Sequence, residues 1–188
     1  MNLISSRRGF MGNTGKLSAV GLALLGGNIA MAQGMAGDAA KDAGILNVAL
    51  GLEHEAIGAY QLGAMSGLLQ KPVLDIAVSF QSHHKAHRDA LIATIEKLGG
   101  KAVAEKKLDD YAKALKADTL KNQADVLDLA ARLELGATNA YLGVIPAFLS
   151  KDLAKVAARL AADETMHYTI LTNALGRPLP AGALSFGA

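Results

Sequence analysis

The chain has 188 residues, 51% hydrophobic and 4% aromatic without tryptophan, which favours one α-helical domain and excludes two domains of ordinary size. Cysteine is absent, which excludes disulfides and every site built on thiolates, including zinc–thiolate, iron–sulfur and blue-copper centres. The formal net charge is +2, and this basic excess comes from the N-terminal segment rather than from the body of the chain.

Arg7 and Arg8 introduce an N-terminal segment that resembles a twin-arginine export signal. An apolar run over 17–32 follows and ends in a small-x-small element. This run has 16 residues, whereas a membrane-spanning helix needs about 20 apolar ones. We therefore predict a signal peptide over 1–32 and a flexible segment over 33–40. The protein is then exported by the twin-arginine machinery, to the periplasm or beyond, without a permanent membrane anchor.

Removal of this leader changes the charge balance of the protein. The leader carries three basic residues and no acidic one, so the mature chain has 19 − 3 = 16 basic residues against 17 acidic ones. The resulting charge of about −1 removes the electrostatic case for nucleic-acid binding. Export of an already folded chain is consistent with a cofactor that is installed before export.

Apolar residues at three- and four-residue steps predict two long helices in the first half of the chain. The first covers 41–69. Pro72 is well placed to open the second, which runs to Leu98 and stops at a Gly-Gly pair.

The second half repeats this plan after a polar segment that contains a short predicted helix over 109–115. The third long helix is predicted over 121–148. Ser150 is the predicted N-cap of the fourth, which closes at Gly176 and leaves a C-terminal tail over 177–188.

The lengths of the three connections predict how the helices are arranged. A short link forces antiparallel neighbours, whereas a link of about 20 residues easily reaches the length of a 25-residue helix. The order here is short, long, short. The predicted fold is an all-α, four-helix bundle over 41–176 with a long crossover between helices two and three.

The most informative pattern is a set of carboxylates, tyrosines and imidazoles that occurs twice in the same order. In each half a Glu precedes a Tyr by seven residues, and two residues three apart follow that Glu, by 31 and 34 positions in the first half and by 30 and 33 in the second. The members are Glu53, Tyr60, His84 and His87, then Glu134, Tyr141, Glu164 and His167. The repetition predicts one site built by two similar helix pairs.

The positions of these residues favour a metal site. Glu53 and Glu134 fall in the middle of apolar helical stripes, where an uncompensated buried charge costs several kcal/mol. A bound cation would compensate it. Residues at i and i+3 of a helix lie about 60° apart around its axis, so His84 and His87 can converge on one centre, as can the corresponding pair of helix four.

Tyr60 and Tyr141 lie two helical turns from Glu53 and Glu134, on the same faces. We predict that both are core aromatic residues with satisfied hydroxyls rather than radical or electron-relay sites. A different register of helix one would make Glu55 the ligand in place of Glu53.

On these residues the chain resembles the ferritin-like superfamily, in particular small exported ferritin-like domain proteins of bacteria, over 41–176. The motifs that carry the resemblance are the stretch 52–60, His84-x-x-His87, Glu134 with Tyr141, and Glu164-x-x-His167. In that superfamily one Glu from each of helices one and three, and a Glu-x-x-His from each of helices two and four, hold two metal ions. The resemblance implies two iron or manganese ions as cofactors and, as their ligands, Glu53, His87, Glu134, Glu164 and His167.

His84 departs from the pattern of the superfamily, which has Glu at this position. The departure removes a bridging carboxylate and leaves three formal negative charges instead of four. We keep His84 as the sixth candidate ligand. We expect a weaker preference for a high-valent di-ferric state, or stronger binding of one metal ion than of the other.

Other ionisable residues near the repeated set have simpler interpretations. His83 is predicted to be an exposed neighbour, His54 a residue that supports a ligand or lies on the surface, and Glu55 a solvated or interface acid. Asp89 and Asp163 either orient imidazoles or carry ordinary surface charge.

Three functions are compatible with the sequence. The first is a di-nuclear metal oxidoreductase that acts on O₂ or peroxide, of the ferroxidase, peroxidase or catalase-like kind. The second is iron storage or sequestration. The short tail disfavours a closed cage for it, although apolar outer surfaces of helices one and three are compatible with a homodimer. The third is a metal-free stress or binding protein that keeps the bundle, which His84 favours slightly.

Overall fold

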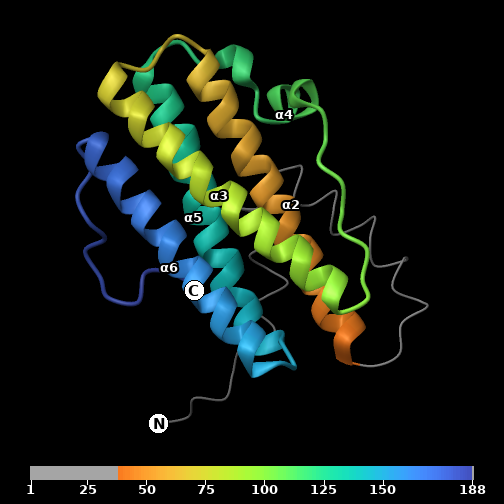
Figure 1. Cartoon of the computed structure of the whole chain (residues 1–188). Helices are drawn as coiled ribbons and strands as arrows, with labels where there is room; N and C mark the ends of the chain where they lie inside the picture. The colour runs from red at the N-terminus through yellow and green to blue at the C-terminus, as the bar shows by residue number, and fades with distance from the viewer. Residues whose placement is uncertain (1–37, 188) are drawn as a thin grey trace.

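The computed structural model describes residues 38–187, so the predicted signal over 1–32 lies outside the described part of the chain. The described residues form helices joined by turns and loops, with no strand among them, which confirms the all-α prediction. The long helices are α2 (Asp38–Met65), α3 (Lys71–Lys97), α5 (Gln123–Val144) and α6 (Lys151–Ala174) (Figure 1). The short ones are α4 (Leu108–Ala114) and the 3₁₀ turns η3 (Ala117–Thr119) and η4 (Ile145–Ala147).

Local signals fix the ends of α3 and α6. Pro72 lies in the first turn of α3, where its missing N–H leaves no helical hydrogen bond unmade. Ser150 is the N-cap of α6, as predicted, because its hydroxyl accepts a hydrogen bond from the Leu153 N–H at 3.3 Å. Gly176 closes α6 with a left-handed φ of +66°.

The first long helix differs from its predicted bounds of 41–69. It is already helical at Asp38, the first described residue, inside the segment predicted to be flexible, where alanines favour the helix. It ends at Met65, and Gly67 turns the chain toward α3 with a φ of +69°.

The third long helix is shorter than its predicted range of 121–148. It ends at Val144 because Pro146 lacks an N–H and its ring crowds the preceding turn. The next residues continue as the tighter turn η4.

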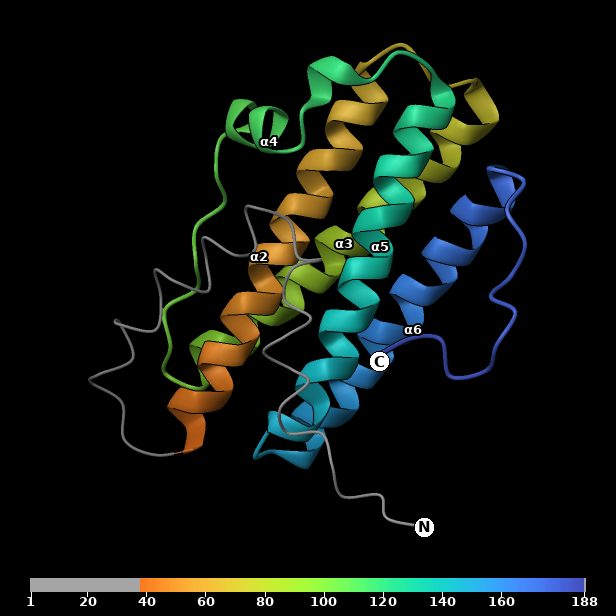
Figure 2. The same cartoon turned by 180° about the vertical axis from the view of Figure 1, so that it is seen from behind.

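The connections are short, long and short, as predicted. The links 66–70 and 145–150 join antiparallel neighbours, α2 with α3 and α5 with α6. The link 98–122 returns along the bundle, so α3 and α5 run in the same direction (Figures 1 and 2). This arrangement confirms a four-helix bundle with a crossover between its second and third long helices.

The crossover is fixed along the outer side of α2. Tyr111 of α4 is buried against Gly58 of α2, where an added Cβ would lie 2.8 Å from the Tyr111 ring. The Asn47 side chain on α2 makes two hydrogen bonds, of 3.0 and 2.8 Å, to backbone groups of the crossover. With α3, α5 and the crossover packed against it, α2 is buried on all sides over residues 53–60.

The apolar core has two parts, and the carboxylates and imidazoles of the repeated set lie between them. One part contains Leu46, Ala49, Leu50, Leu91, Ile95, Tyr141, Ala157, Leu160 and Ala161. The other contains Tyr60, Ala77, Phe80, Leu127, Ala131 and Leu171. Each part comes from all four long helices, so the charged residues between them are enclosed by hydrocarbon at both ends of the bundle.

The C-terminal tail packs on the second helix pair. The Gly187 N–H donates a hydrogen bond to Asn139 Oδ1 at 2.8 Å, and the Phe186 ring lies edge-on to Tyr168 at 5.8 Å between ring centroids. Among residues 38–187, no helix combines the length and apolar character that a membrane span requires.

Candidate metal centre

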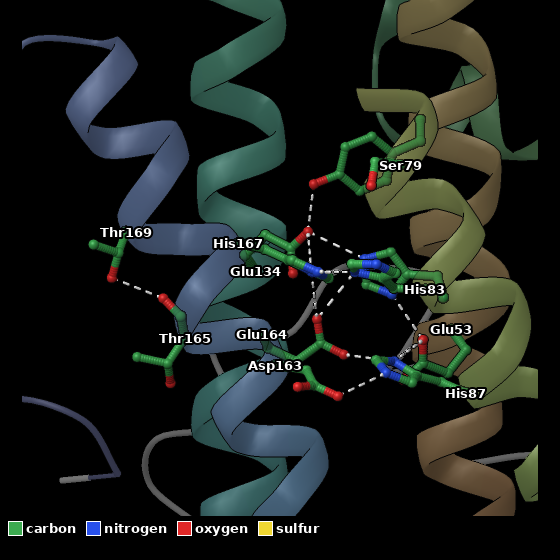
Figure 3. Close-up of polar contacts among 12 residues, drawn as sticks. Glu53, Ser79, His83, His87, Glu134, Asp163, Glu164, Thr165, His167 and Thr169 are labelled. Carbon is green, nitrogen blue, oxygen red and sulfur yellow. Dashed lines mark hydrogen bonds and ion pairs between the residues drawn. The ribbon is translucent and has the colours of Figure 1, made fainter. Parts of the chain in front are cut away.

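The structure brings all six sequence-predicted ligands together in the middle of the bundle. Each long helix contributes to the cluster, and the labelled carboxylates and imidazoles point toward one another (Figure 3). Every one of the six is at most 9% exposed. They are Glu53 on α2, His84 and His87 on α3, Glu134 on α5, and Glu164 and His167 on α6. Below, these residues are called the six-residue cluster.

His84 occupies the centre of the six-residue cluster and uses both of its ring nitrogens. Its Nδ1 lies 2.8 Å from Glu53 Oε2, and its Nε2 lies 3.1 Å from Glu134 Oε1. Glu164 Oε2 is 3.8 Å from the same Nε2. The residue that departs from the superfamily pattern therefore connects the two halves of the repeat.

The other two imidazoles face the cluster through Nδ1. His87 Nδ1 lies 3.3 Å from Glu164 Oε1 and 3.6 Å from Glu53 Oε2. His167 Nδ1 lies 3.2 Å from Glu164 Oε2 and 3.5 Å from Glu134 Oε1. Glu164 is thus shared by these two imidazoles, while Glu53 contacts His87 and Glu134 contacts His167.

The two tyrosines hold the outer carboxylates in a crossed arrangement. The Tyr60 hydroxyl donates to Glu134 Oε1, and the Tyr141 hydroxyl donates to Glu53 Oε1. Side chains on a helix tilt toward its N-terminus, so each Tyr reaches back to the level of the cluster and meets the Glu of the other helix. The prediction of buried tyrosines with satisfied hydroxyls is confirmed, although the sequence alone did not indicate their partners.

A second crossed pair orients the outer nitrogens of the imidazoles. Asp163 of α6 has Oδ2 at 3.2 Å from His87 Nε2 on α3. In return, His83 of α3 has Nδ1 at 2.9 Å from His167 Nε2 on α6. His83 precedes His84 in the chain as Asp163 precedes Glu164, so the two supporting residues occupy equivalent positions of the repeat.

His83 is exposed, as predicted, but it also contacts a candidate ligand, which the sequence analysis missed. Its ring lies nearly parallel to the His167 ring, at 5.2 Å between centroids, and the Phe80 ring stacks on His167 at 4.1 Å. The sequence signal was available in the alignment of the two halves, where His83 matches Asp163.

His54 and Glu55 are not at the surface, since both are at most 3% exposed within the part of α2 that is buried on all sides. The surface alternative for His54 and the solvated position predicted for Glu55 are therefore wrong, while a supporting role of His54 stays a prediction. Burial lowers the pKa of His54. Glu55 belongs to neither candidate group of metal ligands, so Glu53 is the helix-one member of the cluster. Asp89 is exposed and pairs with Arg88, which leaves Asp163 as the aspartate that meets an imidazole.

The ionisation of the cluster is strongly coupled. Burial opposes the charge on Glu53, but the nearby imidazoles of His84 and His87 outweigh it and lower the Glu53 pKa to about 2. Burial likewise opposes the charge on His87, and the nearby carboxylates of Glu164 and Glu53 raise the His87 pKa to about 10. Burial raises the pKa of Glu164 despite its histidine partners. Without metal, positively charged imidazoles therefore neutralise the buried carboxylates.

The cluster also has the features of a metal site. Three buried atoms, Glu134 Oε2, Glu164 Oε1 and His87 Nδ1, make no hydrogen bond within the described chain. Within each of two overlapping groups of four residues, the ligand atoms lie within 4.8 Å of one another. Ligand atoms around one ion lie up to about 4–4.5 Å apart, because metal–oxygen and metal–nitrogen bonds are about 2.0–2.2 Å long. The donors therefore fit metal ions with small side-chain adjustments.

Comparison with known protein families agrees with this geometry. The model of the ferritin-like domain matches residues 41–177, which is most of the chain. The chain belongs to the ferritin-like domain family. Searches of curated proteins and of solved structures returned no match. The ferritin-like assignment thus confirms the resemblance found in the sequence, and the bundle carries a buried His/Glu cluster compatible with a metal site.

Stability of the metal-free ferritin-like protein is expected to fall as the pH rises from 6.5 to 10. His87, with a pKa raised from 6.5 to about 10, stabilises the fold fully below pH 6.5 and loses this contribution as the pH passes through about 10. Glu53, with a pKa lowered from 4.5 to about 2, stabilises it above pH 4.5 and loses this contribution as the pH falls through about 2. In urea unfolding of chelator-treated protein, the free energy of unfolding should be highest between pH 4.5 and pH 6.5. It should fall by at least about 1 kcal/mol by pH 10.

The variant His87→Gln is the control for this measurement, since it should show a smaller alkaline loss. A free energy of unfolding that stays constant or increases from pH 7 to pH 10 would contradict the ionisation scheme.

Removal of the His83 side chain is expected to weaken metal binding without unfolding the bundle. An imidazole that offers Nδ1 to a metal carries its proton on Nε2, and His83 Nδ1, 2.9 Å from His167 Nε2, accepts the hydrogen bond from that N–H. Loss of such a supporting partner typically costs about 10- to 100-fold in metal affinity. Titration with Co²⁺, followed by its visible absorption, should show this loss at one of two metal positions in His83→Ala.

His83→Asp, which places the equivalent of Asp163 beside His167, should restore Co²⁺ binding. The control Ser82→Ala changes an adjacent exposed residue and should leave the titration unchanged. Equal Co²⁺ affinities of wild-type protein and His83→Ala would show that His83 does not support a ligand.

Proposed function

We propose that this protein binds a di-nuclear iron or manganese centre and uses it for oxidoreductase chemistry on O₂ or peroxide, of the ferroxidase, peroxidase or catalase-like kind. The observation that carries the proposal is the set of six buried donors from four helices, arranged in two overlapping groups. Each group contains two carboxylates from different helices and two imidazoles, which is a donor set that iron and manganese accept.

The two groups suggest which residues would hold each ion. Glu53 and His87 would serve one position, and Glu134 and His167 the other, with His84 and Glu164 common to both groups. When bound, the metal pair would supply the redox chemistry with O₂ or peroxide.

The surrounding residues would hold the donors and exclude water. The hydroxyls of Tyr60 and Tyr141 each occupy one oxygen of an outer carboxylate, which limits the rotation of Glu134 and Glu53. Burial raises the pKa of both tyrosines well above its usual range, so the hydroxyls keep their protons and remain donors. The two apolar parts of the core close the site at both ends.

His84 would make this site less negative than the superfamily pattern. Three carboxylates bring a charge of −3, against +4 for two divalent ions, whereas a Glu at position 84 would complete the balance. A site that is short of one carboxylate should favour the divalent state of its metals over a high-valent one, because the extra positive charge is not compensated in a medium of low dielectric constant.

One observation favours a second candidate, a metal-free stress or binding protein. His84 already joins Glu53 and Glu134 through hydrogen bonds of 2.8 and 3.1 Å, and this neutralises part of the buried charge without an ion. The two candidates differ in a single measurable property, the metal content of the folded protein.

Metal content and oxidation rate of matched variants test the proposal. The precursor is the form to assay, because the leader predicted from Arg7 and Arg8 would export the chain folded, with its metal in place. Purified without chelator, the wild-type protein should hold about two iron or manganese ions and oxidise added Fe²⁺ with O₂ or peroxide. Glu134→Ala should lower both properties at least about tenfold, since it removes a carboxylate from the cluster.

Glu96→Ala is the matched control, because Glu96 is exposed on α3, outside the cluster. His84→Glu should tighten binding of the more weakly held of the two ions, because it adds a fourth carboxylate to the cluster. Well under one metal ion per chain in wild-type protein and in every variant would reject the oxidoreductase and support the metal-free candidate.

A further inference from the structure

An apolar pocket lies beside the six-residue cluster, at the end of the bundle where Tyr60 is found. Its volume is about 40 Å³. Fifteen residues line it, contributed by the four long helices, the link 66–70 and the crossover, and among them Tyr60 alone has a polar side-chain atom. The pocket is therefore a hydrocarbon-lined space next to a site of buried charge.

The lining determines what the pocket can hold. A water molecule needs about 10–15 Å³ and two to four polar partners, so this pocket is large enough for water but offers it almost no hydrogen bonds. Enclosed apolar cavities stay dry and bind small apolar molecules such as xenon, and this pocket has the same kind of lining. Peroxide, with its two hydroxyl groups, would lose its hydrogen bonds here, whereas a diatomic gas loses none.

Tyr60 connects the pocket to the cluster. Its ring forms part of the pocket wall, stacks on the His84 ring at 5.4 Å between centroids, and lies edge-on to Phe80 at 6.2 Å. Its hydroxyl donates to Glu134. One aromatic ring thus separates the apolar pocket from two of the candidate metal ligands.

The outer side of the pocket is apolar as well. Ile76 of α3 and Ile170 of α6 line it and are 39% and 44% exposed, so they mark its solvent side. Ala77 and Ala130, which also line it, have small side chains that leave the space between the helices open. A small apolar molecule would meet hydrocarbon along the whole path from solvent to Tyr60.

We propose that this pocket is a binding site for a small apolar molecule of the dioxygen class, which it holds beside the metal centre. The use of bound dioxygen rests on the proposed function, whereas occupancy of the pocket does not require metal. The pocket would raise the local concentration of dioxygen and keep water from the Tyr60 side of the cluster.

Xenon tests occupancy directly, because it is apolar, of similar size, and visible by anomalous diffraction or ¹²⁹Xe NMR. Metal-free wild-type protein under xenon pressure should bind xenon in this pocket. Ala130→Leu, which adds a branched side chain from the partly buried wall, should abolish the signal. If the leucine variant does not fold, the smaller change Ala130→Val takes its place and should weaken the xenon signal.

Ala124→Leu is the matched control on the same helix. Ala124 is exposed and does not line the pocket, so this variant should bind xenon like the wild type. Absence of xenon from the pocket in folded wild-type protein overturns the proposal.

The iron-loaded protein tests the use of the bound molecule. Ala130→Leu should slow O₂ consumption severalfold at low O₂ with an unchanged iron content, while Ala124→Leu should not. Unchanged O₂ consumption in a variant that no longer binds xenon would show that this pocket does not supply dioxygen to the metal centre. A protein that binds xenon in the pocket, but binds no metal and shows no O₂-dependent turnover, would contradict the proposed function. The pocket would still be a binding site for a small apolar molecule.

Discussion

The structure depends on one constraint, the burial of three carboxylates and three imidazoles in the middle of an apolar bundle. Each charge would cost several kcal/mol if it were left unpaired. In the absence of metal the imidazoles supply the compensating charge, and His84 does so for Glu53 and Glu134 at once. A metal ion would replace protons in this role. The same residues can therefore stabilise the fold and offer ligands.

The repeat in the sequence becomes an approximate two-fold relation in space. Tyr60 supports Glu134 while Tyr141 supports Glu53, and Asp163 supports His87 while His83 supports His167. Each supporting side chain comes from the opposite half, so neither helix pair forms its half of the site alone. The relation is broken in two equivalent places, where one half has His83-His84 and the other has Asp163-Glu164. Both differences make the first half less negative than the second.

Much of this arrangement could be predicted from the sequence. The spacing of apolar residues, together with Pro, Gly and Ser at the helix ends, predicted the four long helices. The lengths of the connections predicted the crossover. The six residues of the cluster could be identified because two independent copies agreed in order and spacing. Two copies in phase are far less frequent by chance than one Glu-x-x-His.

Other features depend on contacts that a single sequence does not reveal. The burial of His54 and Glu55 could not be predicted, because the packing of the crossover against the outer side of α2 leaves no local pattern in the sequence. The contact of exposed His83 with His167 requires the mutual position of α3 and α6. The apolar pocket likewise forms from small residues of different helices, such as Ala77 and Ala130, which look like ordinary helix formers in the sequence.

Anomalous diffraction from crystals of the metal-loaded protein tests the central claim most directly. At the iron or manganese absorption edge, the account predicts two peaks inside the bundle, one next to Glu53 and His87 and one next to Glu134 and His167. Peaks confined to the protein surface, or no peak at all in fully folded protein exposed to excess metal, would contradict it.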